Sequence, residues 1–99
     1  MLEAQIFIDQ DEQKEGKPLH EYLMKYLMDW GVSGATSFRG HSGFGKNLRM
    51  KHPNDFFSFD EPPMLIVFID NEEKVKTILT ALRKITTRGF ITVHKVEKW

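Results

Sequence analysis

Three glycines and several basic side chains occur together in one short stretch, which reads Arg-Gly-His-Ser-Gly-Phe-Gly-Lys-Asn over residues 39–47. Glycines at such spacing let backbone N–H groups converge and let a ligand approach the main chain closely. Arg39 and Lys46 can neutralise phosphate oxygens there. Residues 30–54 contain no acidic residue, whereas residues 1–29 hold seven acidic and three basic residues. The stretch therefore has the composition of an anion-binding site; the alternative is a flexible connection whose glycines serve turns and whose basic side chains are solvated.

Residues 40–46 also match the first seven positions of a phosphate-binding P-loop, GxxxxGK. Two features oppose a true P-loop. Asn47 stands where a Ser or Thr hydroxyl would hold magnesium, and residues 48–55 lack a helical pattern of apolar residues and include Pro53. We therefore treat the spacing as a coincidence.

A second interpretation is an RNA-binding module, because RNA-recognition motifs carry exposed aromatic residues on a sheet with the strand order derived below. Phe7 and Phe90 are the candidate stacking residues, in the contexts Ile-Phe-Ile and Arg-Gly-Phe. The Arg-Gly-Phe context lies at the last expected strand, whereas RNA-recognition motifs carry their aromatic residues on the first and third strands. In addition, 14 basic residues are balanced by 14 acidic ones, so the chain lacks the positive field of nucleic-acid-binding proteins. We do not expect a nucleic acid as partner.

The chain offers no recognisable catalytic or metal-binding constellation. The absence of cysteine excludes disulfides, thiolate zinc sites and cysteine nucleophiles together. No two of the four histidines show the i, i+4 spacing of a helix or the i, i+2 spacing of a strand that would bring both to one face. No nucleophile, base and orienting acid can be assigned. We therefore expect a binding protein and not an enzyme, without a metal or a cofactor.

These residues must be positioned by a small α+β fold, because the apolar pattern predicts six elements in the order β-α-β-β-α-β. Strands are expected over residues 2–8, 35–39, 64–70 and 90–96. Helices are expected over about residues 18–30 and from residue 70 or 71 up to about residue 88. Asp70 or Asn71 is expected to cap the second helix, and Pro18 to lie in the first turn of the first. This order is that of the ferredoxin-like fold, with both helices on one face of a four-stranded antiparallel sheet. The length predicts a single domain over residues 1–99.

The other face of this sheet is expected to need a cover that the helices cannot supply. Residues 64–69 are apolar at every position, so that strand has two apolar faces. Phe7 points away from Ile6 and Ile8, so its apolar side chain also needs a cover on this second face. Self-association is the simplest way to cover such a face.

No segment of the sequence has the pattern of a membrane span or a targeting signal. The longest apolar run, residues 64–69, is too short to cross a bilayer, and residues 1–16 lack the basic start and apolar core of a signal peptide. Together with the absence of cysteine, this predicts a cytoplasmic protein without membrane insertion.

Several short motifs resemble the bacterial and archaeal family called domain of unknown function 190. The most specific is the string G-A-T-x-x-R-G-x-x-G-F-G of residues 34–45, and Gly-Lys-Pro-Leu at residues 16–19 and Asp-x-Glu-Glu-Lys at residues 70–74 also match. The resemblance runs nearly end to end. That family is similar in structure to the PII signal-transduction proteins. The copper-tolerance CutA family shares the fold, but a chain without cysteine gives no support for a copper role.

The resemblance implies a PII-like homotrimer whose sheets face inward, with small effectors, usually adenine nucleotides, bound between subunits. It also implies a signalling loop between the second and third strands, here residues 42–61, which contacts a protein target such as a transporter or an enzyme. The loop with which PII proteins hold ATP phosphates is shortened here to residues 86–89, which favours AMP or ADP as the effector.

We therefore expect six ligand contacts, the last of them across a subunit interface: Arg39, Gly40, Gly43, Gly45, Lys46 and Arg88. The leading hypothesis is a PII-like regulatory protein that binds a small anionic effector. The alternatives are a trimeric protein-binding adaptor without a small ligand and, from another class, an RNA-binding module.

Overall fold

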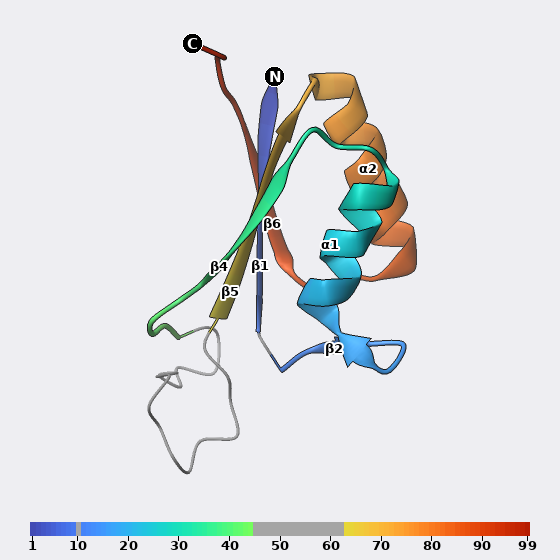
Figure 1. Cartoon of the computed structure of the whole chain (residues 1–99), viewed down its shortest axis with the longest axis vertical. Coiled ribbons are helices and arrows are strands. Elements are labelled where there is room, and N and C mark those ends of the chain that lie inside the picture. Colours follow the sequence, from blue (N-terminus) through green and yellow to red (C-terminus); the bar gives the residue numbers. More distant parts are fainter. Residues whose placement is uncertain (10, 45–62) are drawn as a thin grey trace.

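The structure is a computed structural model that describes residues 1–9, 11–44 and 63–99. Its elements are, in chain order, β1 (Leu2–Asp9), β2 (Gln13–Lys14), β3 (Lys17–Pro18), α1 (Leu19–Asp29), β4 (Ala35–Arg39), β5 (Pro63–Asp70), α2 (Glu72–Ile85) and β6 (Phe90–Lys95). Four strands form one antiparallel sheet in the order β4-β5-β1-β6, and α1 and α2 cover one of its faces (Figure 1). The predicted α+β, ferredoxin-like arrangement is confirmed. Neither described helix is long and apolar enough to span a membrane.

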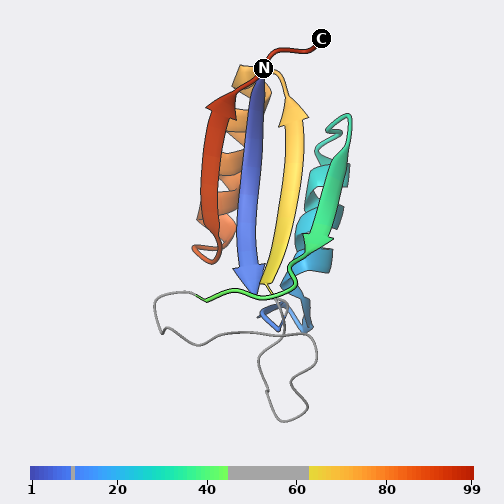
Figure 2. The same cartoon turned by 90° about the vertical axis from the view of Figure 1, so that its left-hand side faces the viewer.

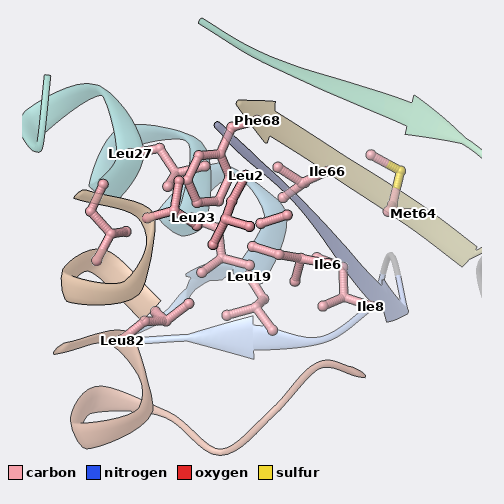
Figure 3. Close-up of a cluster of buried hydrophobic side chains, with 13 residues drawn as sticks. Leu2, Ile6, Ile8, Leu19, Leu23, Leu27, Met64, Ile66, Phe68 and Leu82 are labelled. Carbon is pink, nitrogen blue, oxygen red and sulfur yellow. The ribbon is translucent and has the colours of Figure 1, made fainter. Parts of the chain in front are cut away.

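Apolar side chains from the sheet and both helices meet in one core (Figure 3). Every second residue of β1 is buried, because alternate side chains of a strand point to the same face. The helices contribute side chains at three- and four-residue spacing, namely Leu19, Leu23 and Leu27 from α1 and Val75, Ile78 and Leu82 from α2. Each such burial contributes about 1.5–3 kcal/mol to folding. Ile85, which the pattern placed in the buried stripe, is 39% exposed because α2 ends there, earlier than expected.

A short hairpin joins β1 to α1 where a loop was expected. Strands β2 and β3 pair across Glu15 and Gly16, whose φ angles of 54° and 77° are those of a two-residue hairpin turn. Pro18 ends β3 with φ −54° and ψ 134°, so the expectation that it lies in the first helical turn is wrong. The helix begins at Leu19, whose N–H donates to the carbonyl of Glu12 at 2.7 Å. This bond fixes Glu12 beside the end of β1.

Two neighbouring side chains, those of Asp70 and Asn71, accept backbone hydrogen bonds at the N-terminus of α2. Asn71 Oδ1 accepts a hydrogen bond from the N–H of Lys74, and Asp70 Oδ1 accepts one from the N–H of Asn71, both at 2.8 Å. The Nζ of Lys74 lies 3.3 Å from Asp70 Oδ2. The N–H of Asn71, assisted by Lys74, holds the pKa of Asp70 below its ordinary value.

The second face of the sheet carries no helix in the described part of the chain (Figure 2). One row of cross-strand neighbours on this open face is apolar across all four strands, and it consists of Phe38, Leu65, Phe7 and Phe90. Phe7, Phe38 and Phe90 are 41%, 53% and 68% exposed. The apolar surface is therefore concentrated at the end of the sheet where β1 stops.

Candidate functional site

A cavity of about 440 Å³ lies at this end of the open face, between the end of β1 and the start of β6. Its lining residues are Phe7, Ile8, Asp9, Glu12, Gly43, Phe44, Pro63, Gly89 and Phe90. Figure 2 shows why they meet, because the chain that leaves β4 turns and runs across the ends of β5 and β1. Ligand cavities of proteins commonly measure about 300–1,000 Å³, so this one suits a small molecule.

Two glycines bring the segment after β4 against Pro63. The N–H of Gly40 donates to the carbonyl of Pro63 at 2.7 Å, and a Cβ at Gly40 would stand 2.8 Å from Pro63 Cγ. A Cβ at Gly43 would stand 3.3 Å from the same atom. A larger residue at position 40 would push the segment after β4 away from Pro63. The close approach of Gly40 to Pro63 is therefore a packing contact within the chain. The residues that follow it, Gly43 and Phe44, line the cavity.

The walls of the cavity are largely aromatic. The ring centroids of Phe7 and Phe90 are 6.1 Å apart, with the rings tilted by 46°. Phe44, from the segment that crosses the sheet end, adds a third ring and is 65% exposed. Exposed aromatic faces within a cavity can stack on a flat ring such as a nucleobase.

Asp9 and Glu12 provide two carboxylates at the edge of the cavity. Glu12 Oε1 accepts a hydrogen bond from the N–H of Asp9 at 3.1 Å. Glu12 Oε2 accepts one from Arg88 Nη1 at 3.3 Å, which makes an ion pair between a half-buried carboxylate and an exposed guanidinium. Among the described residues, no three His, Asp or Glu side chains are grouped to hold a metal ion.

Arg88 reaches the site from the connection between α2 and β6. Arg83 shapes this connection, because its guanidinium donates to the carbonyls of Arg88 and Gly89 at 2.9 and 2.8 Å. Gly89 has a φ of 86°, and a Cβ there would stand 3.1 Å from Ile8 Cγ2. Arg88 and Glu12 also line an adjoining hollow of about 500 Å³. The tight connection thus sets Arg88 beside the cavity rather than inside it.

The model of the family DUF190, described as "Uncharacterized ACR, COG1993", matches residues 1–98. The chain belongs to the DUF190 family. It is 37% identical over 92 residues to a UPF0166 protein of Aquifex aeolicus (strain VF5), covering 93% of this chain and 87% of the relative. It is 30% identical over 90 residues to a UPF0166 protein of Methanocaldococcus jannaschii, and the match covers 89% of this chain and 82% of the relative. The resemblance noted from the sequence motifs is confirmed.

Solved structures of CPII, a nitrogen regulatory PII-like protein from Thiomonas intermedia K12, are similar to this DUF190 chain. CPII bound to ADP, AMP and bicarbonate matches with a TM-score of 0.66 at 22% identity, covering 94% of this chain and 82% of that one. CPII bound to ADP and bicarbonate matches with a TM-score of 0.63 at 21% identity and the same coverage. At such identities the likeness concerns the fold, and the expected PII-like fold is confirmed.

The six predicted ligand contacts are only partly brought together in the DUF190 structure. Gly43 lines the cavity, and Arg88 lies at its edge through Glu12. Gly45 and Lys46 lie outside the described residues.

Arg39 and Gly40 take other places. Arg39 is exposed at the end of β4 in register with Met64, which is buried beneath the helices, so its side chain is on the helix-covered side of the sheet. Gly40 packs on Pro63, and its N–H is engaged by that residue. Neither residue lines the cavity.

The sequence pattern did not indicate the carboxylates of Asp9 and Glu12 as ligand groups, and it assigned the aromatic residues to another hypothesis. Phe7 and Phe90 were singled out as stacking residues for RNA, and Phe44 carried a local signal, since it stands between two glycines. Glu12 carried none, because its partner Arg88 is 76 residues away in the chain.

Proposed function

We propose that this DUF190 protein is a PII-like regulatory protein that binds an adenine nucleotide, AMP or ADP, in the cavity between β1, β6 and the segment after β4. The observation that carries the proposal is a cavity of nucleotide size whose walls hold the rings of Phe7, Phe44 and Phe90. Stacking on aromatic side chains is a general way of binding bases. The structures of CPII, which share the fold, hold ADP and AMP.

The phosphate end of the ligand is proposed to meet the acid-free, basic segment of residues 30–54. Gly43 of this segment lines the cavity. Gly45 and Lys46 follow it in the sequence and are predicted as contacts. The connection over residues 86–89 is short, which supports a nucleotide with few phosphates. The role is one of binding and signalling, without catalysis.

We further propose that the protein is a homotrimer whose open sheet faces turn inward and whose effectors bind between subunits. The apolar row across the four strands supports this assembly, because an isolated chain would leave it in water. Residues 42–61 are proposed to report the bound effector to a protein target.

Isothermal titration with AMP, ADP, ATP and cyclic di-AMP, on protein whose mass has been measured by light scattering, tests the nucleotide proposal. A saturable signal for AMP or ADP is expected. Gly43→Val should abolish it, because the added Cβ would stand 3.3 Å from Pro63 Cγ and the larger side chain would displace the segment that lines the cavity. Gly34→Val is the matched control, since a Cβ at Gly34 meets no atom within 4 Å.

Absence of binding for every nucleotide, in a folded trimer, would refute the nucleotide proposal and favour a protein-binding adaptor. A monomer that binds RNA through its open face would favour the RNA-binding alternative instead.

A further inference from the structure

The cavity assigned to a nucleotide has acidic rather than basic polar groups. Among the described residues that line it, the charged side chains are those of Asp9 and Glu12, and the remaining walls are aromatic, aliphatic or glycine. Glu12 is paired with Arg88, so a phosphate at this position would compete with the Glu12 carboxylate for the Arg88 guanidinium. A ligand group that donates hydrogen bonds fits the Glu12 carboxylate without breaking this ion pair.

Glu12 is held in one position by bonds to both its backbone and its side chain. Its N–H donates to the carbonyl of Asp9 at 3.2 Å, and its carbonyl accepts from the N–H of Leu19 at 2.7 Å. Its carboxylate accepts from the N–H of Asp9 and from Arg88. The side chain of Glu12 is 18% exposed, whereas that of Arg88 is 63% exposed. A carboxylate fixed in this way loses little freedom when a ligand binds.

Both carboxylate oxygens of Glu12 can accept further hydrogen bonds. A carboxylate offers about four acceptor sites, and the bonds to Asp9 and Arg88 use one at each oxygen. Two neighbouring acceptors match two hydroxyl groups on neighbouring carbon atoms, as in ribose. Acidic side chains bind the ribose 2′-hydroxyl in dinucleotide-binding proteins for the same reason.

From this geometry, which rests on the proposed function, we infer that Glu12 is the specificity-determining residue of the cavity. Its carboxylate accepts hydrogen bonds from the 2′- and 3′-hydroxyls of the ribose while the base lies against Phe7 and Phe90. Arg88 is then a positioning residue that holds the carboxylate in place. The cavity selects ribonucleotides over deoxyribonucleotides, and the phosphate points away from Glu12.

Titration of the wild-type protein and of Glu12→Gln with AMP and 2′-deoxy-AMP tests this inference. The wild type is expected to bind AMP about tenfold more tightly, because 2′-deoxy-AMP lacks a hydrogen bond to a charged acceptor. Glu12→Gln is expected to bind the two ligands alike, with AMP weakened to the level of 2′-deoxy-AMP. Glutamine has the same shape, and its amide oxygen can still accept from the N–H of Asp9. Its amide nitrogen is a donor and can accept neither from Arg88 nor from a ribose hydroxyl. Thermal unfolding verifies that the variant folds.

Glu73→Gln is the matched control, because it removes the same charge from an exposed side chain in the first turn of α2, at the opposite end of the sheet (Figure 1). It should keep the preference for AMP. If the wild type binds both ligands equally, or if Glu12→Gln keeps the preference, the role of Glu12 is overturned while nucleotide binding stands. Tighter AMP binding by Glu12→Gln would show instead that Glu12 withholds Arg88 from the phosphate. If no nucleotide binds, the proposed function itself fails and this inference fails with it.

Discussion

Three phenylalanine side chains line the cavity and stay exposed, which leaves apolar surface in contact with water. Phe90 is 68% exposed and Phe44 is 65% exposed, so neither contributes fully to the core of the chain. Their rings instead form the walls of the cavity together with Phe7. At the scale of single residues, what distinguishes a stacking role from a filling role is the aromatic face, which an aliphatic side chain of similar size lacks.

Phe90→Leu separates these two roles. We expect AMP affinity to fall about tenfold in isothermal titration, because base–aromatic stacking contributes about 1–3 kcal/mol per base, while the melting temperature changes little. Phe38→Leu is the control, since Phe38 belongs to the same apolar row but does not line the cavity. Equal AMP affinities for the wild type, Phe90→Leu and Phe38→Leu would mean that the ring of Phe90 contributes only apolar surface and does not stack on the base.

At the scale of elements, the sequence predicted well what depends on local pattern. The bounds of β4 are those expected, and the glycine after α1 has the expected positive φ, 75° at Gly31. The hairpin before α1 was not predicted, because its two-residue strands are too short to show alternation. The cap of α2 was predicted as Asp70 or Asn71, and the structure gives each of them a hydrogen bond.

The candidate site was less predictable, because its residues come together through tertiary structure. The glycine-rich segment was recognised, and Gly43 lines the cavity. Arg39 stays a predicted ligand contact, and the register of β4 pairs it with Met64 instead of bringing it to the cavity. That register follows from pairing with β5, which the order of residues in one strand does not reveal.

The start of α2 allows a prediction on pH dependence. The pKa of Asp70 is lowered in the folded protein, so its carboxylate stabilises the fold above its ordinary value of 3.8, and this contribution is lost as the pH falls through the lower folded value. Asp70→Asn should therefore lower the free energy of unfolding by about 1 kcal/mol at neutral pH and by less in acid, as measured by urea denaturation.

Asp29→Asn is the matched control for this prediction. Asp29 pairs with Lys25 at 3.1 Å, but both side chains are more than half exposed, so the loss should stay within about 0.5 kcal/mol. An equal loss of stability in both variants would show that the charge of Asp70 stabilises the fold no more than that of an exposed ion pair.

At the scale of the whole molecule, the cavity and the apolar row occupy the same end of one sheet face. Phe7 and Phe90 belong to both, whereas Phe38 and Leu65 belong to the row alone. In the proposed trimer the inward-facing sheets would cover the row and place a second subunit next to the cavity. Assembly and ligand binding are then coupled, because the same rings serve both.

Phe38→Asp tests this coupling without disturbing the core of the chain, because Phe38 is 53% exposed on an edge strand. Light scattering should give about three times the chain mass of 11.6 kDa for the wild type and a lower mass for the variant, since burying an unpaired carboxylate costs several kcal/mol. AMP affinity should fall with the mass. Met28→Asp, on the outer surface of α1 and 74% exposed, should leave both unchanged. A wild-type monomer, or a trimer that tolerates Asp at position 38, would place any subunit contact away from this row, and the exposed rings would then have to be explained by the ligand alone.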